Sequence, residues 1–258
     1  RMMDHEMNLL KDRIPRKENP SKMFFTYANT VATINYSKKF KGHGWMGIRF
    51  QPAPEKPYNE IMLHVRFHHT EARLQQEAIG IMGVNLVHGA FYCHDEPKKL
   101  LKYLYDHIDS SAIEIDTINF SGPLFKGIDN RILSLQLVKN GMTDAVMFNP
   151  EGNNVLPARA LYKKNILVLR GSFRPVTKVN IDMFEKSYDI FIKEQNVNQN
   201  KTEVIFEITL SNLTAQGEID ESDFMDRARL LGSLGHTVMI SNFKEYYRIC
   251  LLYTSDAA

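Results

Sequence analysis

The chain has 258 residues, of which 43% are hydrophobic and 24% are charged, which is typical of a globular protein and excludes a disordered or fibrous one. The formal net charge of +2 gives no electrostatic footprint for nucleic acid or for an anionic membrane, so we expect neither partner. Two cysteines, Cys93 and Cys250, are too few for a disulfide framework, and no run of about 18 apolar residues could span a membrane.

The first 22 residues are polar and basic, and Pro15 and Pro20 interrupt them, so we expect residues 1–22 to form a loose leader. The chain begins with Arg1 rather than methionine, which suggests an incomplete start. The apolar segment of a signal peptide is not found there. With only two cysteines as well, the sequence favours a cytoplasmic location.

Residues 23–110 predict an α+β domain. Three β-prone segments at 31–36, 45–50 and 60–67 are separated by glycines and prolines, and the third alternates apolar and polar residues as a half-buried strand does. Two helices are expected to follow, at about 71–92 and 96–108.

Residues 111–249 predict a second, β/α domain. Strands are expected at 112–120, 144–148, 165–173, 203–210 and 237–242, and helices at 130–139, 181–194, 221–234 and from 243 onward. Short apolar strands that alternate with helices favour parallel β/α units. The fold class is therefore α/β, and the regular, unfinished alternation favours a truncated (β/α)-barrel, with an open doubly wound sheet as the alternative.

The last nine residues, 250–258, resemble translated sequencing-adapter read-through of the kind found at the ends of metagenomic gene predictions. We expect them to be a non-native tail on a fragment whose natural sequence differs beyond about Ile249, and they are left out of the functional argument.

Polar side chains cluster where the expected strands end, which is where parallel β/α folds bind ligands. Arg170 and Glu207 lie inside apolar strands rather than after them, and Asn242 ends the last strand. A buried, unpaired carboxylate is costly, so Glu207 needs a partner, a ligand or a raised pKa. Catalysis by Glu207 and Arg170 and a structural ion pair between them are both open at this stage.

Residues 171–177 read Gly-Ser-Phe-Arg-Pro-Val-Thr directly after a predicted strand. This segment resembles the first motif, Gly-Ser-Phe-x-Pro-x-Thr, of the nucleotidylyltransferase superfamily, which includes nicotinate-nucleotide and pantetheine-phosphate adenylyltransferases. The resemblance implies that Gly171, Ser172 and Thr177 approach nucleotide phosphates and that Mg-ATP is the cofactor. In the family a glycine and a catalytic histidine follow, whereas this chain continues Lys-Val-Asn at 178–180, which puts adenylyl transfer in doubt.

The chain as a whole resembles a largely uncharacterised bacterial family of Bacteroidetes and Planctomycetes, with members about twice this length. The segments that carry this resemblance are 47–50, 79–86, 129–131, 142–148 and 170–177. Members carry the automatic labels nicotinate-nucleotide adenylyltransferase or TonB-dependent receptor. The receptor label fits poorly with the many helices expected here.

Histidines and a cysteine form a second group, with His64 and His68 on one expected strand and His88, Cys93 and His94 near the end of a helix. Zinc accepts such ligands, but their spacing matches no metal-binding pattern, and we expect no metal site.

We predict a cytoplasmic metabolic enzyme that acts on a phosphorylated small molecule or a nucleotide, with a nucleotidyltransferase-like, ATP-binding transferase as its most specific form. Glu207 and Arg170 are the expected catalytic residues. Phosphate or nucleotide contacts are expected at Gly171, Ser172, Thr177 and Asn242. The alternatives are a barrel-type sugar-phosphate lyase, isomerase or phosphoribosyltransferase, and a non-catalytic ligand-binding or scaffold protein.

Overall fold

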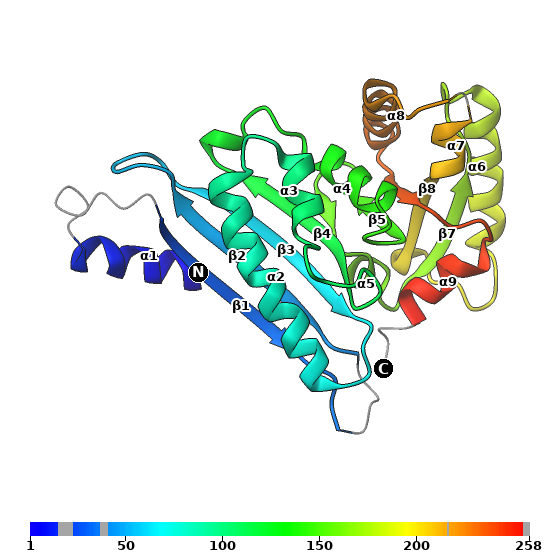
Figure 1. The fold of residues 1–258 in the computed structure, drawn as a ribbon. Helices are drawn as coiled ribbons and strands as arrows, with labels where there is room; N and C mark the ends of the chain where they lie inside the picture. The colour runs from blue at the N-terminus through cyan, green and yellow to red at the C-terminus, as the bar shows by residue number, and fades with distance from the viewer. Residues whose placement is uncertain (15–22, 37–40, 216, 255–258) are drawn as a thin grey trace. The chain divides into compact units, whose positions relative to one another are not determined.

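The chain divides into two compact units, Arg1–Leu133 and Ser134–Ala258, in a computed structural model that describes residues 1–14, 23–36, 41–215 and 217–254 (Figure 1). We expected the boundary near residue 110. It lies later because β4 (Ile113–Ser121) pairs with β3 (Asn59–Phe67) and so completes the first sheet instead of starting the second.

The first unit is built on a four-stranded antiparallel sheet in the order β1-β2-β3-β4, where β1 is Phe24–Ala32 and β2 is His43–Gln51. The apolar positions of β3 alternate as expected, and Ile61, Leu63 and Val65 are fully buried. Two helices, α2 (Ala72–Tyr92) and α3 (Pro97–Tyr103), join β3 to β4, and η1 (Pro123–Phe125) follows β4. Phe91 of α2 packs on Phe50 of β2, so α2 covers this apolar face of the sheet (Figure 1).

The opposite face of the first sheet carries α1 (Met2–Arg13), where the sequence predicted a loose leader. Met3 and Met7 lie one helical turn apart and are both buried, and the Met3 side chain reaches the Gly47 position on β2. Two apolar residues four positions apart are a weak helix signal in a polar segment, which is why the prediction was wrong for residues 2–13. The rest of the expected leader, residues 15–22, lies outside the described residues.

The second unit contains a five-stranded sheet in the order β6-β5-β9-β8-β7. Its strands are β5 (Ala145–Phe148), β6 (Asn154–Val155), β7 (Asn165–Arg170), β8 (Thr202–Thr209) and β9 (Thr237–Ser241). Three of them, β7, β8 and β9, are parallel as expected, but β5 runs antiparallel to β9. Within the described residues neither sheet closes on itself, so the α/β class is confirmed and the expected barrel is not.

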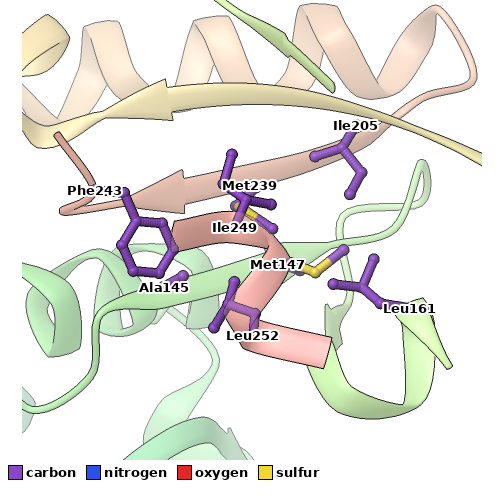
Figure 2. Packing of buried hydrophobic residues seen from close by; sticks show 8 residues of the cluster. All are labelled: Ala145, Met147, Leu161, Ile205, Met239, Phe243, Ile249 and Leu252. Carbon is purple, nitrogen blue, oxygen red and sulfur yellow. The ribbon is translucent and has the colours of Figure 1, made fainter. Parts of the chain in front are cut away.

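The helices of the second unit are α5 (Pro157–Leu161), α6 (Lys178–Phe191), α7 (Leu210–Thr214), α8 (Glu221–Ser233) and α9 (Tyr247–Thr254), with the short η2 (Gln199–Lys201) before β8. One more helix, α4 (Asn130–Lys139), spans the boundary between the two units. Part of the core is a cluster of eight buried residues, shown in Figure 2: Ala145, Met147, Leu161, Ile205, Met239, Phe243, Ile249 and Leu252. Leu252 belongs to the segment we expected to be a non-native tail, yet it packs in this core, and residues 255–258 lie outside the described part. Among the helices described in either unit, none combines the length and apolarity needed to cross a bilayer.

Candidate functional site

The carboxyl ends of β7, β8 and β9 lie at one edge of the second sheet because the three strands are parallel and in register. This edge gathers most of the residues expected to bind a ligand. Gly171 leaves β7, and its backbone N–H donates to the Glu207 carbonyl at 3.1 Å. Asn242 leaves β9 with an exposed side chain, and its backbone N–H donates to the Asp144 carbonyl at 2.9 Å. These residues therefore follow the carboxyl ends of neighbouring parallel strands, and their role in ligand binding stays a prediction.

Glu207 is fully buried on β8 and is paired with Arg170 on the neighbouring strand β7. The Arg170 guanidinium donates from Nε to Glu207 Oε2 at 2.7 Å and from Nη2 to Oε1 at 3.0 Å. The Ser241 hydroxyl on β9 donates to the same Oε1 at 2.5 Å. One carboxylate thus joins three parallel strands through three hydrogen bonds.

The outer side of Arg170 is also occupied. Its Nη1 donates to the Lys244 carbonyl at 2.9 Å, and its guanidinium carbon lies 4.2 Å from the centre of the Tyr246 ring. The hydrogen bonds with Glu207 raise the pKa of Arg170, so the guanidinium stays charged. A carboxylate held on both oxygens and closed to solvent has little freedom to exchange a proton with a substrate, so this arrangement favours the structural ion pair over catalysis.

The Phe173 ring leaves little room for a side chain at Gly171. A Cβ atom at this position would lie 3.0 Å from the nearest atom of the Phe173 ring. Phe173 has φ +45°, in the left-handed region that bulky residues rarely adopt, and its buried ring packs edge-on against Phe206 with centroids 5.2 Å apart. Burial of the ring offsets the strained backbone, and the small size of Gly171 makes that burial possible.

Thr177 is the N-cap of α6, which begins three residues earlier than predicted. Its hydroxyl accepts from the Asn180 backbone N–H at 3.4 Å, and Asn180 Oδ1 accepts from the Thr177 backbone N–H at 2.9 Å, which forms a capping box. The Thr177 hydroxyl therefore satisfies the helix end, and its link to a phosphate would be through the positive end of the helix dipole.

Two arginines to which the sequence assigned no role lie at the loop of residues 171–177. One, Arg174, belongs to the loop, and the other, Arg227, contacts it from α8. Arg227 of α8 is only 4% exposed, and its Nη1 donates to the Ser172 carbonyl at 2.9 Å. Asp223 pairs with Arg227 and also with Arg174, whose Nε lies 3.0 Å from Asp223 Oδ1. The Nε of Arg227 is buried without a hydrogen-bond partner. Two guanidinium groups therefore contact one carboxylate beside this loop.

A different group of polar residues lies in the first unit, on the sheet face opposite α2. His64 of β3 is 2% exposed and its Nδ1 lies 2.7 Å from Asp116 Oδ1 on β4. The Nε2 of His64 lies 3.3 Å from Nδ1 of His43, an exposed residue at the start of β2. The Trp45 ring stands edge-on to His64, with centroids 5.0 Å apart.

A β-bulge brings Asp116 into this group. The pairing of β3 with β4 shifts so that His64 faces Thr117 while Val65 faces Ile115, which leaves Asp116 as the extra residue. The sequence signal was an acidic residue inside a predicted strand, but a bulge cannot be read from alternation alone. Burial raises the pKa of Asp116, and its hydrogen bond with His64 opposes that shift.

The histidines considered earlier as metal ligands do not come together as a group of three. Among the residues that the structure describes, no three side chains of His, Cys, Asp or Glu are arranged to hold a metal ion. His88 stacks on the Tyr103 ring with centroids 4.6 Å apart, and Cys93 is buried. His68 lies 3.6 Å from the Glu114 carboxylate.

No known protein family, curated protein or solved structure matches this chain.

Proposed function

We propose that the second unit binds the phosphate group of a phosphorylated small molecule or nucleotide at residues 171–178, as part of a cytoplasmic metabolic enzyme. The observation that carries the proposal is the buried Arg227, which contacts this loop and keeps an unpartnered Nε–H. Buried donors are nearly always satisfied, so such a group indicates a missing water or ligand.

Three further features support an anionic ligand here. Arg174 is 41% exposed and belongs to the loop itself. Lys178 opens α6, whose first-turn amides point out of the positive end of the helix. The loop leaves the carboxyl end of a parallel strand, which is where α/β sheets bind ligands.

The class of ligand separates the versions of this proposal. An adenylyltransferase-like enzyme binds ATP with Mg²⁺. This chain lacks the histidine that the adenylyltransferase family uses after the motif. A sugar-phosphate lyase, isomerase or phosphoribosyltransferase binds a sugar phosphate without ATP. A scaffold protein responds to neither.

The test is the thermal stability of the full chain with Mg-ATP, nicotinate mononucleotide, ribose 5-phosphate and inorganic phosphate. A ligand present at 100 times its Kd stabilises the folded state by about 2.7 kcal/mol. We expect one of these compounds to raise Tm, and Arg174→Gln to remove the rise. Arg229→Gln, an exposed arginine on α8 that pairs only with Asp226 at 3.8 Å among the described ion pairs, is the matched control and should leave the rise unchanged. No rise with any compound, or an equal loss in both variants, would refute phosphate binding at the loop.

A further inference from the structure

In the first unit, the imidazole rings of His43 and His64 face each other through nitrogen atoms. The Nδ1 of His43 and the Nε2 of His64 are 3.3 Å apart. This is long for a hydrogen bond from a ring N–H. It matches two nitrogens bound to one tetrahedral ion, since bonds of about 2.0–2.1 Å place the ligand atoms roughly 3.3–3.4 Å apart.

Asp116 holds the His64 imidazole ring in the orientation that binding an ion would need. Asp116 Oδ1 lies 2.7 Å from His64 Nδ1, and it accepts the imidazole proton when that proton is on Nδ1. The lone pair of His64 is then on Nε2, which faces His43. A carboxylate that holds the far nitrogen of a metal-binding histidine is the usual outer partner at protein metal sites, where it fixes the tautomer and makes the ligand more basic.

Another polar group beside the two rings, the Thr117 hydroxyl, has no hydrogen-bond partner. Thr117, the cross-strand neighbour of His64 on β4, is 6% exposed, and its hydroxyl is buried without a hydrogen bond. The bulge that turns Asp116 toward His64 also puts Thr117 on this face. A hydroxyl in this position can hold a water molecule bound to an ion.

Acidic side chains also lie beside His64. Arg66 lies between two of them, with its Nη2 2.9 Å from Glu114 and its Nε 3.5 Å from Asp116.

We propose that His43 and His64 bind one divalent late first-row transition ion, with Asp116 as the positioning residue behind His64. Imidazole nitrogen suits Zn²⁺, Ni²⁺ and Cu²⁺ better than Mg²⁺ or Ca²⁺. Water or a small chelating ligand completes the coordination, because the described residues offer no third ligand. The site belongs to the first unit and is independent of the phosphate loop.

The test is calorimetric titration of the full chain with ZnCl₂, with Cys250→Ser as the parent because Cys250 is an exposed thiol. We expect one ion per chain. His43→Ala removes an exposed side chain and should keep the fold while it weakens binding at least 10-fold. Asp116→Asn should weaken it roughly 10- to 100-fold. His107→Ala, an 86% exposed histidine of the same unit, is the matched control and should bind Zn²⁺ as the parent does.

Two results would overturn the proposal. The parent could bind no Zn²⁺, or it could bind Zn²⁺ equally well after His43→Ala. In either case the two rings form a hydrogen-bonded imidazole pair and not a metal site. Co²⁺ gives a separate readout, since a tetrahedral site with nitrogen ligands produces visible absorption that His43→Ala should abolish.

Discussion

Replacing Glu207 with alanine tests whether the buried ion pair holds the second sheet together. The substitution removes three hydrogen bonds, two from Arg170 and one from Ser241, and leaves the Arg170 guanidinium without its carboxylate. Breaking one partner out of a buried pair costs about 3–5 kcal/mol. Since whole domains are stable by only about 5–15 kcal/mol, the second unit should lose a large part of its stability.

Hydrogen exchange measured by mass spectrometry gives the assay, because it reports separately on peptides from β7, β8 and β9. The single tryptophan, Trp45, lies in the first unit, so its fluorescence serves as an internal reference that should not change. Lys164→Ala breaks the more exposed ion pair between the residue that precedes β7 and Glu203 of β8, and it should cost only about 0–1 kcal/mol. The double variant Arg170→Met with Glu207→Leu should recover most of the loss, since apolar residues can replace a buried pair. If Glu207→Ala kept the exchange protection of β8 within about 1 kcal/mol, the structural reasoning would be wrong, and a role in binding or catalysis would regain support.

Two further predictions concern the pH dependence of the second unit and a side chain that joins β4 to α4. Burial beside Phe184 and Phe206 lowers the pKa of His236, so the unfolded chain takes up a proton first as pH falls. The stability that this group contributes is complete above about pH 6.5 and is lost as pH falls through its lower folded pKa. Urea denaturation of His236→Gln should therefore show a smaller loss of unfolding free energy between about pH 7 and 5 than the parent does. An equal loss in the two proteins would exclude His236 as the cause. Asn130 Oδ1 accepts the Phe120 backbone N–H at 2.8 Å, and its Nδ2 donates to the Phe120 carbonyl at 3.1 Å. Asn130→Ala should therefore lower the free energy of unfolding of the first unit, measured by urea denaturation, by about 1–3 kcal/mol, and Asn130→Asp should lower it less because it keeps the acceptor. An unchanged free energy of unfolding in Asn130→Ala would contradict this.

Most helices and strands of this fold could be predicted from local pattern. The alternation in β3 and the apolar strands β8 and β9 determined their type, because burial on one or both faces imposes a period that the residues must follow. Pairing between strands could not be predicted in the same way. That β4 joins β3, and that β5 runs against β9, depends on contacts between residues far apart in the chain, and these pairings exclude the expected all-parallel second domain.

The candidate sites also differ in whether local sequence or distant contacts determine them. The partnership of Arg170 with Glu207 was one of two open interpretations, because two charges inside neighbouring apolar strands need each other. Arg227 could not be found, since an arginine on an amphipathic helix resembles any surface arginine until its burial is known. The Asp116, His64 and His43 group was missed because it needs a bulge and three strands in register, neither of which leaves a short sequence motif.

The order of strands in the second sheet has a consequence for how the chain is made. The middle strand, β9, is the last of the five to be synthesised, and it alone joins the β6-β5 pair to the β8-β7 pair. While a ribosome has yet to release residues 237–241, the nascent unit consists of two separate ribbons, and Glu207 has not met Ser241. A chain stopped before Thr237 would therefore leave two unjoined strand edges open to other chains, so the completion of this sheet waits on β9.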